Sequence, residues 1–457
     1  MMRKAAACLL AGVAFAFTNG MVLAATSNIF STGAGRSDTP SLSASLHLQR
    51  FGEQHDPLRV LLQETAGKRA ALVVLDMTSL FGHTILAVRR VVRGNAGIAP
   101  DDVLVIASHT FSAPHIFPPS AYLEGPDKAE DVTRGERFAS ALNAAVQRAN
   151  ADAVKSLRPA TVGFGSAFAK IDVSRNVETA RARWLGASDA GPSDKSVQTL
   201  RFDHMAHNSV AGLANYAVQS SITDQVAVDG HDTAITADPA GAAMDHVEQQ
   251  LGEGAVCLFL IGAAGDQVPS FTARQHLLDG QGADRVRGSG AYPLIALQGE
   301  RMGEAVLAAE PPHSSSLADV DLDVQNRSVD LANQERPRDL AQLEPTRAYQ
   351  YQFSGHSPAS YAILAIGDVA IVGVQVKRSA STGVWIKDHS PITHTLVVTM
   401  VNGTAKYLPH SESDRRFAYE AMNSSYVPGS VEVMANSVVA SLQQMHGARP
   451  GGRCHGR

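Results

Sequence analysis

The segment "RAALVVLDMTSLFGHTILAVRRVVRGNAGIAPDDVLVIASHT", residues 69–110, determines the fold class. It opens with a continuous apolar run over 69–77, which predicts a strand buried on both faces. Apolar residues at helical spacing follow over 83–97 and end at a glycine, as is typical of a helix stop. A second apolar run over 101–110 completes a strand–helix–strand unit, which predicts an α/β fold.

Predicted strands and helices also alternate along the rest of the chain. No stretch of sequence recurs, and no segment has the composition of a clear linker. We therefore expect one α/β domain with a mixed sheet, and we interpret the charged segment 311–346 as an excursion from it. The patterns predict helices over about 132–156, 239–252 and 430–445, a hairpin over 197–221, a strand entering a glycine-rich loop over 254–270, and strand pairs over 360–376 and 394–409.

Size, charge and cysteine content limit the class of protein. A chain of 457 residues with 44% hydrophobic residues can bury a large core. Its net charge of -5 and the lack of a basic run argue against a nucleic-acid partner. Of its three cysteines, Cys8 lies in the N-terminal apolar run, Cys257 in a predicted core strand and Cys454 in the C-terminal tail. That placement predicts neither disulfides nor a cysteine-type zinc site.

The first 25 residues are typical of a secretory signal peptide. "MMRK" is positively charged, "AAACLLAGVAFAF" is apolar, and "VLAATS" offers a cleavage site after Ala24 or Ala25. The apolar run is too short for a membrane anchor. We expect a periplasmic or secreted protein in which residues 26–66, rich in Ser, Thr and Gly, form a polar lead-in to a domain over 67–457.

Two features of the strand ends suggest chemistry. His109 follows the second strand of the opening unit, where α/β sheets place their sites, although a structural core histidine is as good an interpretation. "GAAGDQVP" (262–269) brings glycines and free amides to a strand end, but it is neither a P-loop nor a nucleophile elbow. The other histidines considered as metal ligands are better read as solvated or structural: His115, His204, His207 and His231.

Segments in the same order along the chain resemble motifs of the neutral (non-lysosomal) ceramidases, over about residues 68–445. No single motif is intact, and the resemblance rests on the fact that the segments occur in the same order as the family's motifs. The segments are "VVLDMTSLFG", "LVIASHTFSAP", similar to His-Thr-His-Ser-Gly-Pro, "VSRNVE", "LRFDHMAHNSVAGLANYAVQSS", "ITADPAGAA", "FLIGAAGDQVP", "AIGDVAIVGVQV" and "VNGTAKYLP", similar to Asn-Gly-x-x-Gly-Tyr-x-Pro.

The resemblance implies the catalytic-domain fold of zinc amidases that cleave the N-acyl bond of ceramide, without the family's C-terminal β-domain. That family binds zinc through two histidines, a glutamate and a tyrosine. His109 matches the first histidine and Tyr407 the tyrosine, but Gln219 stands at the second histidine and Lys377 at the glutamate. No glutamate occurs between 345 and 411, so a shifted alignment does not restore the ligand.

Two further positions of the family site have become apolar. Phe111 replaces the second histidine of the His-Thr-His motif, and Val268 replaces a polar residue of the Gly-Asp loop. A catalytic zinc needs about three protein ligands, and a lysine ammonium cannot coordinate it and repels it. The sequence therefore predicts a former metal site, with no metal and no cofactor.

Three functions remain open for such a site. We favour a metal-free acid–base enzyme, an isomerase or cyclase acting on a small hydrophobic substrate, lipid-like or polycyclic, with peripheral membrane contact. The alternatives are a zinc-dependent amide hydrolase and a non-catalytic lipid-binding pseudoenzyme; the oligomeric state is not indicated. The residues of the favoured site are Lys377, Tyr407 and His109 for catalysis, and Phe111, Gln219, Gly265, Asp266 and Val268 for substrate binding.

The degraded ligand set predicts that the purified protein carries no stoichiometric zinc and keeps its activity in a chelator. Elemental analysis of the purified chain measures this directly. One tightly held zinc per chain would contradict the prediction, and would point to His115 or His231 as replacement ligands.

Overall fold

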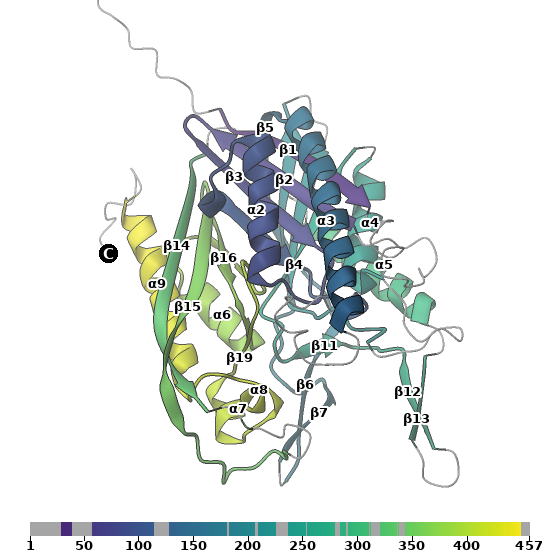
Figure 1. Ribbon diagram of the computed structural model, residues 1–457, viewed down its shortest axis with the longest axis vertical. Helices are drawn as coiled ribbons and strands as arrows, with labels where there is room; N and C mark the ends of the chain where they lie inside the picture. The colour runs from purple at the N-terminus through teal and green to yellow at the C-terminus, as the bar shows by residue number, and fades with distance from the viewer. Residues whose placement is uncertain are drawn as a thin grey trace, which may run out of the picture.

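The computed structural model is a four-layer α/β sandwich in which two sheets pack face to face between helices (Figure 1). A two-stranded hairpin, β12–β13, projects from it at the lower right of that view. The structure describes residues 29–38, 57–113, 128–180, 182–205, 209–224, 236–252, 254–278, 284–288, 291–309, 311, 320–335, 337 and 343–448.

The larger sheet has eight strands in the order β10-β9-β8-β5-β1-β2-β3-β4. Its β3 and β4 run parallel and are connected through helix α2, which confirms the strand–helix–strand unit predicted from residues 69–110. The sheet is mixed, because other neighbours such as β8 and β9 are antiparallel. Its strands are β1 (Ser31–Asp38), β2 (Pro57–Thr65), β3 (Lys68–Leu75), β4 (Val103–Ala107), β5 (Arg158–Phe168), β8 (Ser196–His204), β9 (Ser209–Tyr216) and β10 (Val256–Ile261).

The second sheet has four strands in the order β14-β15-β16-β18. Alternate residues of its strands face the larger sheet or the helices α6 and α9, so both faces are buried along β16, β18 and the second half of β15, whereas β14 is partly exposed. Short strands outside these sheets complete the structure. The remaining strands are β6 (Asp172–Glu178), β7 (Arg183–Ser188), β11 (Gln267–Pro269), β12 (Arg274–Leu278), β13 (Asp284–Gly288), β14 (Leu322–Gln334), β15 (Phe353–Ile366), β16 (Val369–Val374), β17 (Val376–Arg378), β18 (His394–Val398) and β19 (Ala405–Leu408).

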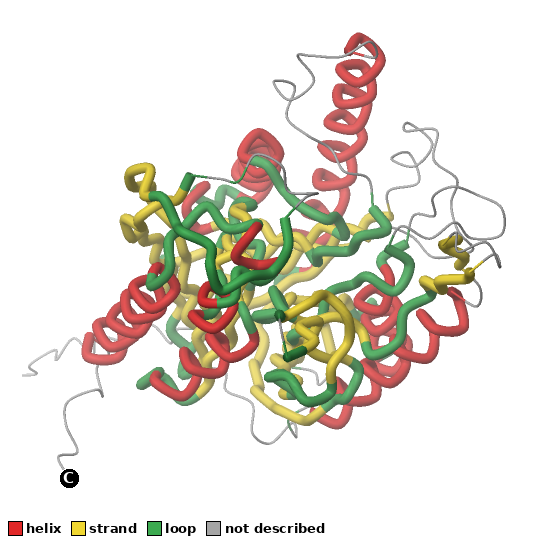
Figure 2. Tube along the Cα trace, turned by 90° about the horizontal axis from the view of Figure 1, so that it is seen from below, coloured by secondary structure: helices red, strands yellow, loops and turns green. Residues whose placement is uncertain are grey.

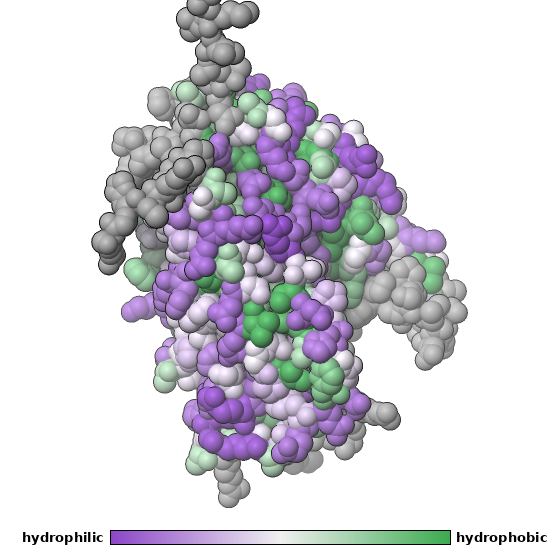
Figure 3. All heavy atoms as spheres, turned by 90° about the vertical axis from the view of Figure 1, so that its left-hand side faces the viewer, coloured by the Kyte–Doolittle hydropathy of each residue, from purple (hydrophilic) through white to green (hydrophobic). Residues whose placement is uncertain are grey.

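Helices cover the outer face of each sheet. Four of them, α2 to α5, pack on the larger sheet, and α6 and α9 pack on the smaller one. The face that carries α9 is mostly hydrophilic, with small, separate hydrophobic patches (Figure 3). The helices are α2 (Gly82–Ala96), η1 (Pro100–Asp102), α3 (Lys128–Ser156), α4 (Asp238–Leu251), α5 (Ala291–Ala309), α6 (Ala380–His389), α7 (Ser411–Arg415), α8 (Tyr419–Met422) and α9 (Ser430–Ala448).

Two expectations about organisation were wrong. The segment 26–66 is not only a lead-in, because it supplies β1 and β2, two inner strands of the larger sheet. The segment 311–346 contains β14, which pairs along almost its whole length with β15. The predicted signal peptide lies outside the described residues, as do His115, His207, His231 and Cys454; none of the helices that are described has the length and hydrophobicity to cross a membrane.

Two arginines are almost completely buried, in opposite electrostatic surroundings. Arg59 is 2% exposed and lies within 3.4 Å of Asp76, 3.0 Å of Asp245 and 3.0 Å of Glu248. Arg378 is 0% exposed, and none of its three side-chain nitrogens has a hydrogen-bond partner among the described residues. Burial lowers the pKa of Arg378 to about 10.

Replacing each arginine with methionine should therefore change stability in opposite directions. Arg378→Met removes a buried charge without a partner and should raise the free energy of unfolding by about 1–3 kcal/mol. Arg59→Met leaves buried carboxylates without their cation and should lower it by about 3–5 kcal/mol. Denaturant unfolding measures both; a less stable Arg378→Met protein would show that the guanidinium has a stabilising partner outside the described residues.

Candidate active site

The predicted catalytic residues Lys377 and Tyr407 lie on neighbouring strands. The short strands β17 and β19 pair in parallel, with these two residues directly in register. Residues in register on adjacent strands share a face of the sheet, so both side chains lie on the same side. Strand β19 lies in the lower half of the molecule (Figure 1), and the view from below shows loops and turns gathered at that end (Figure 2).

The amine of Lys377 lies in a poorly solvated, cationic environment. Its Nζ is 3.5 Å from Oη of Tyr407, and 4.8 Å and 5.7 Å from the ring centroids of Tyr407 and Phe111. Burial, followed by the positive charges of Arg175 and Lys406, lowers the pKa of Lys377 to about 7. A substantial fraction of this lysine is therefore neutral near pH 7.

His109 joins this group through an aromatic contact. Its imidazole is 1% exposed and lies edge-on to Phe111, with ring centroids 4.7 Å apart. The Nδ1 atom is hydrogen-bonded to the carbonyl of Thr78, so Nδ1 carries a proton. His109 also has φ of 63°, a left-handed conformation that is uncommon for a residue with a side chain. Phe111 thus contacts both His109 and Lys377.

The sequence did not single out Arg175, which lies at the centre of this site. Its guanidinium stands 5.0 Å and 4.8 Å from the rings of Tyr407 and Tyr419, and its Nε donates to Glu420 at 2.8 Å. Burial alone would lower the pKa of Arg175, but Tyr407 and Glu420 raise it above its usual value. The only signal was the segment "VSRNVE", which the resemblance included without assigning a role to the arginine.

Asp238 is a second group that the sequence did not identify. It begins α4, is fully buried, and accepts hydrogen bonds at 3.4 Å from Ser112 and Thr223. Burial raises the pKa of Asp238 to about 7. Since Ser112 directly follows Phe111, this carboxyl group lies next to the loop that carries His109 and Phe111.

The residues predicted to bind substrate hold the site together. The side chain of Gln219 donates to the carbonyl of Ala264 at 2.7 Å, and Asp266 accepts from the backbone of Ala380 at 2.8 Å. Gly265 donates its N–H to the carbonyl of Arg378, and Val268 pairs on β11 with Val173. These contacts are structural, and binding of a substrate by these residues stays a prediction.

The donors at these positions do not fit a zinc ion. The ammonium or amine of Lys377 stands beside Tyr407, the amide nitrogen of Gln219 is used to hold Ala264, and Phe111 has no donor. No group of three or more His, Cys, Asp or Glu side chains with metal-binding geometry occurs in the part of the chain that the structure describes. The prediction of a metal-free protein still depends on elemental analysis, since several histidines lie outside that part.

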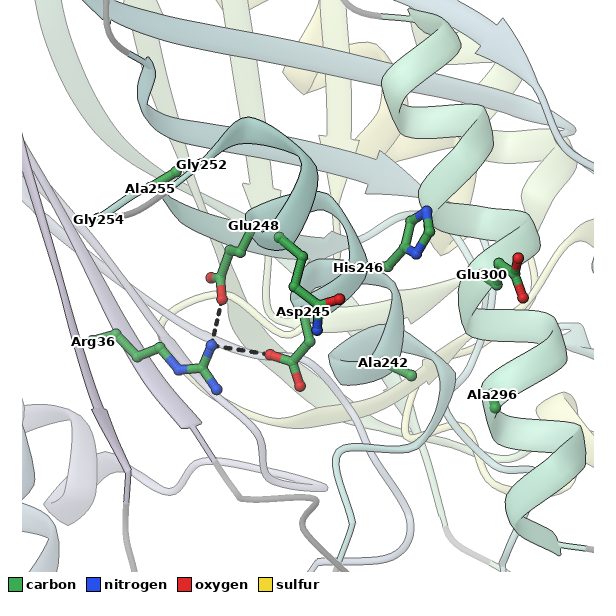
Figure 4. Close-up of a pocket in the computed structure, with 11 residues that line it drawn as sticks. Arg36, Ala242, Asp245, His246, Glu248, Gly252, Gly254, Ala255, Ala296 and Glu300 are labelled. Atoms are coloured by element: carbon green, nitrogen blue, oxygen red, sulfur yellow. Dashed lines mark hydrogen bonds and ion pairs between the residues drawn. The ribbon is translucent and has the colours of Figure 1, made fainter.

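A cavity of about 700 Å³ lies outside this site, between α4, α5 and the strand β1 (Figure 4). Arg36 reaches into it and is ion-paired with Asp245, at 3.0 Å, and with Glu248. Its charged side chains are thus partly neutralised by one another, and no sequence-predicted site residue lines it.

Comparison with solved structures assigns the fold. A neutral ceramidase from Pseudomonas aeruginosa matches with a TM-score of 0.65 and 16% identity, over 91% of this chain and 75% of that chain. A ceramidase complexed with C2 matches with a TM-score of 0.67 and 15% identity over the same shares. No protein-family model and no curated protein sequence matches. The chain is a mixed α/β protein, and it has a divergent form of the neutral ceramidase fold, as the sequence predicted.

The surroundings of Lys377 predict an amine that titrates near pH 7. Competitive acetylation as a function of pH, followed by mass spectrometry of the peptide that contains Lys377, should give a midpoint of about 7. Arg175→Gln should move that midpoint upward, and Lys406→Gln should move it less, because Arg175 is the larger electrostatic cause. Lys387, which is ion-paired with Asp194, is the internal reference; an unchanged midpoint in both variants would contradict this account.

Proposed function

We propose that this protein is a metal-free acid–base enzyme that isomerises or cyclises a hydrophobic substrate. The observation that carries the proposal is the pair formed by Lys377, with a pKa lowered to about 7, and the hydroxyl of Tyr407 at 3.5 Å. A base is most effective when its pKa lies near the working pH, and an acid within reach of it can return a proton.

In the proposed reaction the neutral amine of Lys377 takes a proton from a carbon atom of the substrate. The hydroxyl of Tyr407 donates a proton at a second position, so that a double bond moves or a ring closes. The proton on Lys377 then returns to Tyr407, and the composition of the substrate is unchanged. Arg175, over the ring of Tyr407, stabilises negative charge that develops there.

The apolar side chains around the site support a hydrophobic substrate. Phe111 contacts both Lys377 and His109, and Val268 lies on the strand next to the one that bears Arg175. On the small sheet that includes this strand, Trp184 and Leu185 are 43% and 52% exposed. These exposed side chains support the expectation of peripheral contact with a membrane. We further propose a periplasmic or secreted location, which is supported by the signal-peptide pattern of the first 25 residues.

The second candidate is the hydrolysis of an N-acyl amide. The observation in its favour is the likeness to structures named as ceramidases. Fold alone is weak support for an activity, and the residues around Lys377 do not supply the ligands of a zinc hydrolase. The two candidates differ in their products, because isomerisation conserves mass whereas hydrolysis adds water and releases two fragments.

The test is incubation of the enzyme with a lipid extract of the organism that produces it, followed by high-resolution mass spectrometry. We expect a compound that is converted to a product of the same mass, with a rate that rises as the pH passes through about 7 because Lys377 loses its proton. Lys377→Ala and Tyr407→Phe should each reduce turnover by about 100-fold or more. Release of a fatty acid and an amine would support the amidase instead.

Lys387→Ala is the matched control, since it removes a lysine of α6 that pairs with Asp194 outside the site. It should keep the turnover of the wild type, and thermal unfolding should show that all variants are folded. Full turnover by a folded Lys377→Ala protein would refute the acid–base proposal. Binding of the compound without any conversion would favour the lipid-binding pseudoenzyme.

A further inference from the structure

A cavity of about 270 Å³ lies between α6 and α9, outside the site described above. Its volume is close to the lower end of the range for small-molecule sites, about 300–1,000 Å³. A ligand for it would therefore be small. The lining combines apolar side chains, Trp385, Val431 and Ala435, with polar ones, Ser381, Thr382, His410, Glu432 and Asn436.

The charge of this cavity comes from Glu432. No ion pair or hydrogen bond joins the Glu432 carboxylate to another of the described residues, whereas the nearby Arg415 and Arg416 pair with Glu412. The negative charge of Glu432 acts on its neighbours: after burial, it is the next cause that raises the pKa of Asp414 to about 8. Arg183 and Arg415 also act on His410 of the lining, so Glu432, which is exposed, gives the cavity a local negative charge with which no described cation pairs directly.

We propose that this cavity binds a small organic ammonium ion with an apolar body. Glu432 supplies the opposite charge, and Val431 and Ala435 would contact the apolar part. The indole of Trp385 stacks on His389 with ring centroids 4.0 Å apart, which leaves its other face as an aromatic surface that attracts cations. A neutral ligand would leave Glu432 without a partner, and an anion would be repelled by it. The proposal requires only binding and does not depend on the proposed acid–base activity.

The cavity also has a direct connection to the candidate active site. Ser381 and Thr382 belong to the first turn of α6, and the N–H of Ala380 at the start of that helix donates to Asp266 at 2.8 Å. Lys377 lies on the strand that leads into the same helix. An occupant of the cavity would thus contact the helix that fixes the Gly-Asp loop.

Tryptophan fluorescence can report binding, because the chain has 2 tryptophans, and Trp184, on β7, does not line the cavity whereas Trp385 does. In a Trp184→Phe protein, Trp385 is the only tryptophan. We expect cyclohexylmethylammonium to change its emission saturably at millimolar concentration. The neutral analogue cyclohexylmethanol should bind about threefold to fivefold more weakly, as should the ammonium ion to a Glu432→Gln variant, because a partly exposed ion pair contributes that much.

Glu300→Gln is the matched control, since it removes an exposed helical glutamate that does not line this cavity. It should leave the affinity unchanged. Calorimetry with the unsubstituted chain repeats the comparison of the two ligands if the tryptophan variant does not fold. The proposal is overturned by the absence of saturable binding, by equal affinity for the ammonium ion and the alcohol, or by equal effects of the two glutamate substitutions.

Discussion

The loop at Gly265 and Asp266 joins the three segments that carry the candidate site. The carboxylate of Asp266 accepts the N–H of Ala380, and its backbone carbonyl accepts the N–H of Arg175 at 2.9 Å. Gly265 donates to the carbonyl of Arg378 at 2.6 Å, and a Cβ atom at Gly265 would lie 2.7 Å from that oxygen. Strands β6 and β17 are thereby fixed to the end of β10, so the position of Lys377 relative to Arg175 depends on this loop.

The balance of charge around that loop determines what the site can do. Arg175, Lys377 and Lys406 are cations, while Glu420 is the carboxylate that pairs with Arg175. Repulsion among these buried cations falls when one of them loses its proton. A lysine side chain does so far more readily than an arginine side chain. The same excess of positive charge opposes a divalent ion. The positive charges around Lys377 therefore favour a neutral amine at this position.

The main strands and most helices could be predicted from the sequence because buried strands and amphipathic helices have strong patterns. The strand β1 could not, since its composition resembles a flexible linker. Its Gly33 and Gly35 lie against the backbone of α3, where a Cβ atom would be 2.2 Å and 2.0 Å from the carbonyl oxygens of Ala153 and Ala149. Close helix packing thus requires the glycines that made this segment resemble a polar lead-in. The charged β14 is an edge strand, where polar side chains are expected.

Residues of the candidate site could be predicted from the sequence only where a single position matched a motif of the resembled family. Arg175 and Glu420 are 245 positions apart, so no local pattern connects them. Lys377 and Arg378 show most clearly what cannot be predicted from the sequence. They are adjacent cations, and nothing in the sequence indicates which of them faces the candidate site. Neighbouring residues on a strand point to opposite faces; hence Lys377 faces Tyr407 and Phe111, while Arg378 is buried near Tyr361. Which of the two enters the site depends on the face of β17 to which each side chain points, and the sequence alone does not specify that face.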